Sequence, residues 1–156
     1  MPNVNGNTAI ERANRVNAAV RVIGLNHRTL GIHALKGSGL HAGQEWVLEA
    51  LVEQSPRSHA ELAGWSGCEP PTVTSTVTKL EAAGYVTRTR RADDARVVDV
   101  AITDAGRAAL ASIEGAWIAL AEATVGSLTD EGAPDRIDDL ERIAERLRAA
   151  REATRT

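Results

Sequence analysis

The chain has 156 residues, of which 43% are hydrophobic and 25% charged, and its formal net charge is −3. These values are typical of one ordinary globular domain, or of two small units packed closely together. No apolar run reaches the length of a transmembrane helix, and the polar N-terminal stretch MPNVNGNT does not resemble a signal peptide. The single cysteine, Cys68, excludes an intrachain disulfide, so we expect a cytoplasmic protein with no membrane partner.

Hydrophobic periodicity predicts four helices in the first half of the chain. The first runs from Thr8 to about Leu35, where the segment KGSG interrupts the pattern. A second helix is expected over about 42–54, and its buried face would consist of Val47, Leu48, Leu51 and Val52. The short helix HAELAGWS follows Ser58. The fourth helix begins at Pro70 and Pro71, since proline is favoured in the first turn of a helix.

The second half of the chain predicts a hairpin followed by two helices. The fourth helix runs to Ala83, and Gly84 is a candidate for the left-handed residue that ends it. The segments YVTRTRR and RVVDVAI alternate in polarity, and the tetrapeptide ADDA between them suits a hairpin tip. Thr103 and Asp104 are typical of a helix start, and we expect one long helix over 105–128. A final amphipathic helix follows, with Ile137, Leu140, Ile143, Ala144 and Leu147 on its apolar face.

The predicted fold class is mainly α with a small β-hairpin wing. The order of elements is that of a helix-turn-helix followed by a hairpin, with further helices on both sides. The outer helices have apolar faces but no obvious partner within one small domain. We therefore expect them to pack against each other and, across a two-fold axis, against a second copy of the chain.

Several short motifs in this order resemble the MarR family of winged helix-turn-helix regulators. They are ELA at 61–63, the turn at Gly67, TVT at 72–74, KLEAAGYV at 79–86, DAR at 94–96 and VAITDAGRA at 100–108. Each motif alone is weak evidence, but together they occur in the family's order and spacing. The resemblance also covers the preceding segment GLHAGQEWVLEAL and, in length and position, the flanking helices.

The resemblance implies a homodimer that regulates transcription and binds double-stranded DNA at a pseudo-palindromic operator. Residues 1–40 and 103–156 would form the helical dimerisation region, and residues 41–102 the winged DNA-binding region. It further implies repression that is relieved by a small effector, often aromatic, anionic or antibiotic-like, bound between the dimer helices and the winged lobe.

The helix over 70–83 has a core face and an exposed face. At 100° per residue, Val73, Val77 and Leu80 gather on one side and are expected to face the core. The predicted DNA contacts on the other side are Pro71, Thr72, Thr74, Ser75, Thr78 and Lys79. Short hydroxyl side chains allow a close approach to base edges and phosphates in a major groove. Family members often carry a long polar residue at the position of Ser75, which cannot itself make a bidentate contact with guanine.

Positive charge is concentrated in the predicted wing, although the net charge of the chain is negative. Because nucleic-acid binding depends on the local clustering of Lys and Arg, a negative total does not exclude it. By resemblance, Arg96 is expected to enter a minor groove and Asp94 to orient it. Arg88 and Arg90 are further predicted DNA contacts, while about half of Arg88, Arg90 and Arg91 would be solvated strand residues.

The predicted effector pocket consists of His27, Glu45, Trp46 and Trp117. Glu45 shares a helix face with Leu48 and Val52, and a carboxylate that points inward needs a partner. It could hold a basic ligand group, a metal or a neighbouring arginine, or it could be a first-turn acid favoured by the helix dipole. His27 is a core or interface group or a ligand contact, and Trp117 belongs to the dimer core or to the pocket wall.

Other chemistries have little support in the sequence. Zinc needs several converging ligands, and no histidine occurs beyond His59. Cys68 lies in the turn rather than in the N-terminal helix where the family's peroxide sensors have their cysteine, so we interpret it as a buried small hydrophobe. There is no Ser-His-Asp arrangement or phosphate-binding glycine loop. We predict no cofactor, no metal and no enzyme activity; the alternatives are a winged-helix module that binds protein, or a DNA-binding regulator without an effector.

Overall fold

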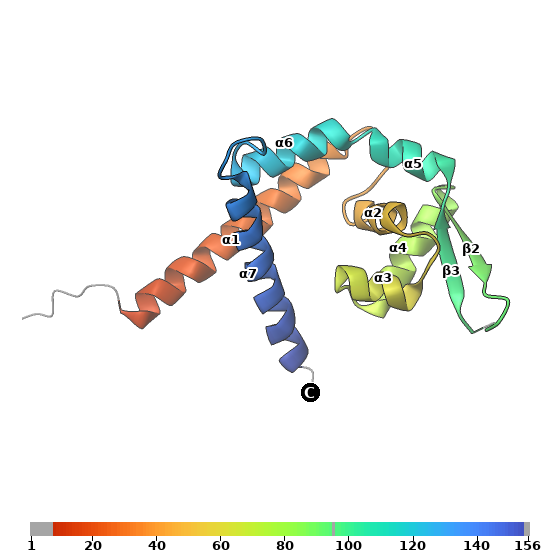
Figure 1. Ribbon diagram of the computed structural model, residues 1–156, viewed down its shortest axis with the longest axis horizontal. Coiled ribbons are helices and arrows are strands. Elements are labelled where there is room, and N and C mark those ends of the chain that lie inside the picture. Colours follow the sequence, from red (N-terminus) through yellow and green to blue (C-terminus); the bar gives the residue numbers. More distant parts are fainter. Residues whose placement is uncertain (1–7, 95, 155–156) are drawn as a thin grey trace, which may run out of the picture.

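The computed structural model describes residues 8–94 and 96–154, which form a winged lobe and a set of outer helices (Figure 1). The elements of the lobe are α2 (Glu45–Glu53), β1 (Arg57–Ser58), α3 (His59–Ser66), α4 (Pro70–Ala82), β2 (Val86–Arg90) and β3 (Val98–Ile102). The outer helices are α1 (Ala9–Ala34), α5 (Asp104–Ala111), α6 (Glu114–Val125) and α7 (Ala133–Ala153). The predicted fold class, mainly helical with a small β-hairpin wing, is confirmed.

Helix caps define the helix-turn-helix. Ser58 and Glu61 form a capping box at the start of α3: the Glu61 amide donates to the Ser58 hydroxyl (3.2 Å), and the Ser58 amide donates to the Glu61 carboxylate (2.6 Å). Gly67 ends α3 in the left-handed region, with φ of 66°. Pro70 and Pro71 open α4 as predicted, and Gly84 follows its end with φ of 77°.

The sheet contains one strand more than the sequence predicts. Its order is β1–β3–β2, with both pairs antiparallel, and the hairpin register places Val86 opposite Ile102 and Arg90 opposite Val98. Strand β1 is only two residues long, which is too short to produce an alternating pattern. Ala95, the last residue of the predicted hairpin tip, lies outside the described residues.

The lobe has its own hydrophobic core, which the helices and the sheet share. Its fully buried large side chains are Val47, Leu48, Leu51, Leu62, Val73, Val77, Leu80, Val86 and Val100. The prediction that Val52 belongs to the buried face of α2 is wrong, because this side chain is 50% exposed. It lies at the edge of the face, beyond Leu48 and Leu51, where no neighbouring element covers it.

The single helix predicted over 105–128 is also wrong, because it is divided into α5 and α6. The two helices meet at Ser112 and Ile113 with a bend of 45°. The Ser112 hydroxyl donates to the Ala109 carbonyl (2.7 Å), and such local bonds compete with helix propagation. Ile113 remains buried at the bend, so the apolar periodicity continues through the interruption and conceals it.

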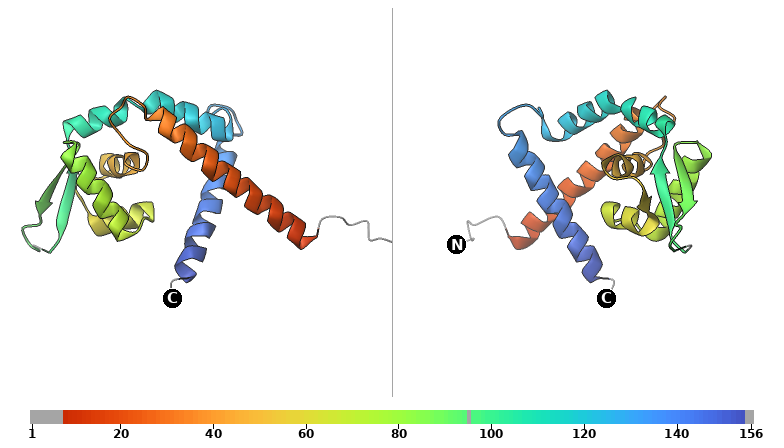
Figure 2. Two further views of the ribbon diagram at one scale, coloured as in Figure 1. Left: turned by 180° about the vertical axis from the view of Figure 1, so that it is seen from behind. Right: turned by 45° about the vertical axis from the view of Figure 1, so that its right-hand side comes forward.

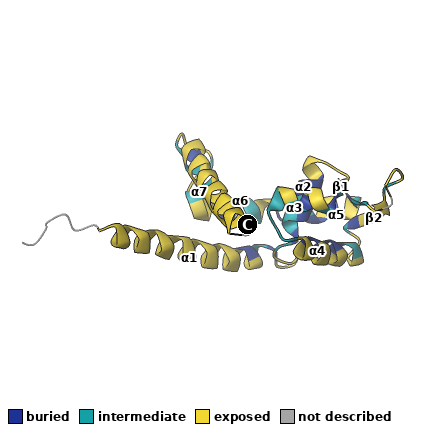
Figure 3. Ribbon diagram, turned by 90° about the horizontal axis from the view of Figure 1, so that it is seen from below, coloured by how far each residue is buried: buried dark blue, intermediate teal, exposed yellow. Residues whose placement is uncertain are grey.

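The outer helices leave most of their apolar side chains exposed. Figure 3 shows α1 and α7 as almost entirely exposed ribbons beside a lobe with a buried interior. Only Gly31 is buried along α1, where it packs against Leu120 of α6. From behind, α1 and α7 diverge from the region of α6 in different directions (Figure 2). Within the described residues no single helix is long and apolar enough to span a membrane; only the bent pair α5 and α6 meets such a test by length and composition.

Tyr85 lies at the junction between α4, the wing and α5. Its carbonyl accepts a hydrogen bond from the Thr103 amide (3.0 Å), and its hydroxyl and its carbonyl each pack against a glycine, Gly39 and Gly106 respectively. A β-carbon at either glycine would overlap these oxygens. The Gly106 contact is with backbone, which cannot rotate away.

We expect Gly106→Ala and Gly64→Ala to change stability in opposite directions, although both glycines are helical. Alanine is favoured over glycine by about 1 kcal/mol in a helix, and a β-carbon at Gly64 meets nothing within 4 Å. At Gly106 the same methyl group collides with the Tyr85 carbonyl, which we expect to destabilise the fold by about 1–3 kcal/mol. Urea unfolding of both variants provides the measurement; a stabilised Gly106→Ala variant would contradict the close packing at this junction.

Candidate nucleic-acid interface

Helix α4 presents a short polar face to solvent, as the periodicity predicts. Val73, Val77 and Leu80 are fully buried, and Thr76 is also buried on that side. The exposed residues are Pro71, Thr72, Thr74, Ser75, Thr78 and Lys79. All six predicted contacts on this helix therefore lie on one accessible surface, which carries a single charge.

The hydroxyl groups on this face are not equivalent. Thr74 donates to the Pro70 carbonyl (3.0 Å) and Thr78 donates to the Thr74 carbonyl (2.8 Å). Both protons are thus used within the helix, so these side chains offer a DNA base only acceptor lone pairs and a methyl group. Within the described part of the chain the hydroxyls of Thr72 and Ser75 make no such bond, and they are available as donors as well.

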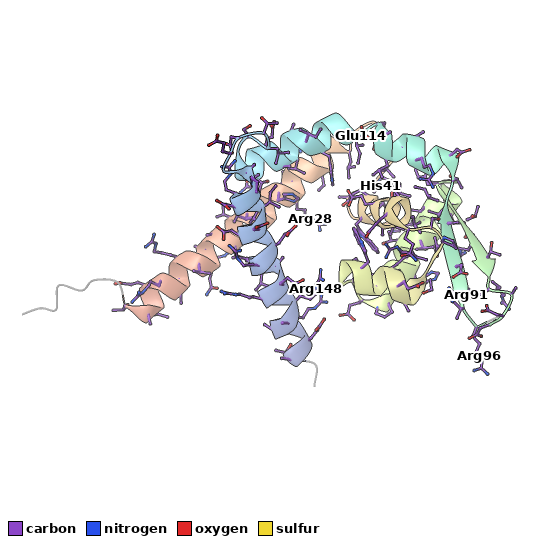
Figure 4. All side chains as sticks on the ribbon, in the orientation of Figure 1. Arg28, His41, Arg91, Arg96, Glu114 and Arg148 are labelled. Atoms are coloured by element: carbon purple, nitrogen blue, oxygen red, sulfur yellow. The ribbon has the colours of Figure 1, made fainter. Side chains whose placement is uncertain are left out.

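The wing places an exposed arginine at its tip. Arg96 points away from the body of the lobe (Figure 4), and its backbone amide donates to the Asp94 carboxylate (3.0 Å). Asp94 therefore fixes the backbone at the tip rather than the guanidinium group. The Arg96 side chain is left fully available to an external partner.

The other wing arginines divide into paired and exposed groups. Arg91 binds Asp99 through two of its nitrogens, one of them at 3.0 Å, and this pairing lowers the pKa of the Asp99 carboxyl. Arg88 pairs with Glu81 at the end of α4, and its hydrogen bond lowers the pKa of Glu81. Arg90 is exposed on β2. Arg91 is thus a structural residue, whereas Arg88 would have to exchange a carboxylate for a phosphate in order to bind DNA.

A surface hollow brings three of the predicted contacts together. Thr74, Arg88 and Arg96 lie around it, and its other lining residues are Ser58, His59, Ala60, Val97 and Val98. His59, in the first turn of α3, is a candidate DNA contact that the sequence interpretation did not include. The available signal was its position directly after the capping residue of the helix that precedes α4.

The predicted effector residues come from three different helices, α1, α2 and α6. His27 is exposed on α1, and Trp46 is half-buried against the lobe core. Glu45 accepts a hydrogen bond from the Gly43 amide (2.8 Å), which agrees with its interpretation as a first-turn acid. Cys68 is only partly buried against the core. The described residues also contain no group of His, Cys, Asp or Glu that could hold a metal ion.

Glu49 lies beside two of the predicted effector residues, Glu45 and Trp117, but the sequence interpretation did not include it. Burial raises the pKa of its carboxyl, and the neighbouring Glu45 carboxylate raises it further, while a hydrogen bond from Trp117 acts in the opposite direction. Glu49 therefore lies beside Glu45 on α2 and also contacts the indole group of α6. Periodicity did not indicate Glu49, because its partner Trp117 comes from a distant helix, α6.

Comparison with known proteins agrees with this geometry. Residues 42–98 match the family model described as MarR family. The matched segment contains α2, α3, α4 and β2, so the chain resembles this family over most of its winged lobe. No curated protein sequence matches it.

Solved structures extend the agreement beyond the matched MarR segment. The transcriptional regulator BldR from Sulfolobus solfataricus is 26% identical, with a TM-score of 0.73 over 90% of this chain and 99% of that one. BpsR from Bordetella bronchiseptica, whose DNA binding is regulated by 6-hydroxynicotinic acid, is 24% identical, with a TM-score of 0.73 over 84% and 98%. PcaV from Streptomyces coelicolor, solved with its natural ligand, is 19% identical, with a TM-score of 0.76 over 89% and 98%. The chain therefore has the winged fold of these transcriptional regulators.

We expect Glu49→Gln to stabilise the protein at neutral pH, by about one degree in Tm. The pKa of Glu49 is raised above its ordinary value of 4.5, so the folded protein favours the protonated carboxyl. The stability that this group contributes is therefore fully present below pH 4.5 and is lost as the pH rises through the folded-state pKa. Glutamine does not ionise, so it avoids this loss of stability, and its amide oxygen can still accept the hydrogen bond from Trp117. The advantage should disappear as the pH falls toward 4.5.

Thermal unfolding between pH 4 and 8 measures this effect, with Glu141→Gln on the exposed surface of α7 as the control for lost charge. An equal response of both variants at every pH would show that the environment of Glu49 has no influence.

Proposed function

We propose that the protein acts as a homodimeric repressor whose two winged lobes bind the half-sites of a pseudo-palindromic operator. The observation that carries this proposal is the exposed arginine at the tip of the wing, combined with the accessible hydroxyl face of α4 on the same lobe. In this arrangement α4 enters a major groove and Arg96 the adjacent minor groove, where negative potential favours a guanidinium group.

The division of the chain into two regions follows from the same proposal. Residues 41–102 form the DNA-binding lobe, and residues 1–40 and 103–156 form the dimerisation region. Support comes from the large apolar side chains that the outer helices leave uncovered, such as Val16, Leu25, Ile118 and Leu147, each more than half exposed. Apolar surface on this scale is typical of an interface between protein chains.

We further propose that a small organic acid releases the protein from DNA. A hollow of about 400 Å³ lies where α1 leads into α2, bordered by Ile32, His33, Lys36 and His41. Its basic and imidazole groups suit a carboxylate, and it lies between an outer helix and the lobe. The regulation of BpsR by 6-hydroxynicotinic acid supports an effector of this class.

Replacing Arg96 with alanine should weaken DNA binding about tenfold or more, because each half-site loses a minor-groove contact. The probe is a duplex selected by the wild-type protein from a random-sequence pool, and affinity is measured by mobility shift at several salt concentrations. Arg142→Ala removes one charge from α7 and provides the control. Light scattering should find the same oligomer for all three proteins.

Two outcomes contradict the DNA-binding proposal. Unchanged affinity of Arg96→Ala would remove the wing tip from the interface. Failure of the wild-type protein to select any duplex would favour a winged module that binds protein instead.

An aromatic carboxylate such as 6-hydroxynicotinic acid should raise the Tm and release the selected duplex. Occupancy at one hundred times Kd would stabilise the folded protein by about 2.7 kcal/mol. Lys36→Gln should reduce both effects, since it removes a charge from the hollow without reducing its polarity. Cationic compounds of similar size are the control; a response to the cations alone would instead indicate the acid pair Glu45 and Glu49.

A further inference from the structure

The last turns of α7 contact the turn of the helix-turn-helix, although the two lie at opposite ends of the sequence. The Arg151 guanidinium donates a hydrogen bond to the Gly67 carbonyl. Arg148, one turn earlier, lies on the same side of α7, toward α3 (Figure 4). A β-carbon built on Gly67 would lie 3.4 Å from the Arg148 Nε and 3.4 Å from a terminal nitrogen of Arg151.

The chemistry of Gly67 explains why arginine contacts it. Gly67 is the residue that ends α3, and its amide donates to the Ala63 carbonyl (2.8 Å). Carbonyl groups at a helix C-terminus have no partner within the helix and carry its negative dipole end, so they favour a cation. The absence of a side chain at this position also allows both arginine side chains to approach the backbone.

The other end of α7 is anchored near α6. Ala133, the first residue of α7, is buried, and Arg136 donates to the Ser127 carbonyl and to the Asp130 carboxylate, both at 2.7 Å. Eighteen residues separate Ala133 from Arg151, which corresponds to about 27 Å along a helix. Helix α7 thus runs from the outer helices to the turn of the lobe at Gly67.

The contact between Arg151 and Gly67 joins parts of the chain that lie on the two sides of the bend between α5 and α6. The lobe continues directly into α5, and α6 packs against α1, so a change of angle at Ser112 and Ile113 would swing the lobe relative to the outer helices. We call the contact of Arg148 and Arg151 with Gly67 the strut. Because the strut joins α7 to the lobe at a point distant from the bend, it would oppose that rotation.

We propose that Arg148 and Arg151 are positioning residues that fix the orientation of the lobe and thereby set the spacing between operator half-sites. This inference rests on the proposed function, because half-site spacing has meaning only for a dimer on DNA. In a two-fold symmetric dimer the separation of the two reading helices must match that of the half-sites, so a rotation of the lobes changes the preferred spacing.

The test uses the full-length protein and the duplex that the wild-type protein selects from a random pool. Its two half-sites are kept constant, and their separation is changed in single base-pair steps. We expect the affinity of the wild-type protein for the best spacing to exceed its affinity for spacings one base pair shorter or longer by about tenfold. For the double variant R148A/R151A we expect this ratio to be about threefold or less. Arg151→Lys, which keeps a cationic donor, should restore part of the preference, and Arg142→Ala on the same helix should keep all of it.

The outcomes separate this inference from the function on which it rests. Failure to select a duplex would refute the DNA-binding proposal itself. A selected duplex with identical spacing profiles for wild type and R148A/R151A would overturn the strut, as would a wild-type profile without an optimum. A uniform loss of affinity at every spacing, with a weaker salt dependence, would also overturn it, because that is the signature of arginines that bind phosphates directly.

Discussion

The hydrogen bonds of Thr103 hold α4 and the wing, which carry the candidate interface, to α5. Its amide donates to the Tyr85 carbonyl (3.0 Å), its hydroxyl donates to the Gly84 carbonyl (2.8 Å), and the same hydroxyl accepts the Gly106 amide (3.1 Å). One residue therefore caps α5, terminates the wing and fixes the exit of α4. Because these bonds are between adjacent backbone segments, α4 cannot move relative to α5 without breaking them.

The chemistry of α4 limits how the protein can recognise a sequence. Two of its exposed threonines, Thr74 and Thr78, donate their hydroxyl protons to the helix backbone, and Ser75 has only a short side chain. The hydroxyl side chains can accept hydrogen bonds from amino groups and contact thymine methyl groups, so Lys79 is the one residue of this face suited to the acceptor pair of guanine. In the proposed complex with DNA, phosphate contacts and DNA shape would supply a larger share of the affinity, and Arg96 is placed to contribute to both.

Features with a local cause could be predicted from the sequence, and features that arise from contacts between distant segments could not. Val73, Val77 and Leu80 were correctly assigned to the core because helix periodicity decides their orientation, and Thr103 was recognised from its capping chemistry. Strand β1 exists only because β3 lies beside it. The break at Ser112 was missed because a buried Ile113 preserves the apolar pattern, and Glu49 was missed because its neighbour Trp117 comes from another helix.

The proposed effector hollow and the Thr103 junction share a physical connection. Gly39 borders the hollow, has φ of 80°, and packs against the Tyr85 hydroxyl, which occupies the space that a β-carbon would need. Tyr85 in turn gives its carbonyl to Thr103, at the point where α4 ends and α5 begins. A ligand that shifts the loop around Gly39 would press on Tyr85 and so on both helices at once. Since α5 leads to the bend beside α6, the same displacement would act on the orientation of the lobe, which the α7 contact at Gly67 opposes from the other side.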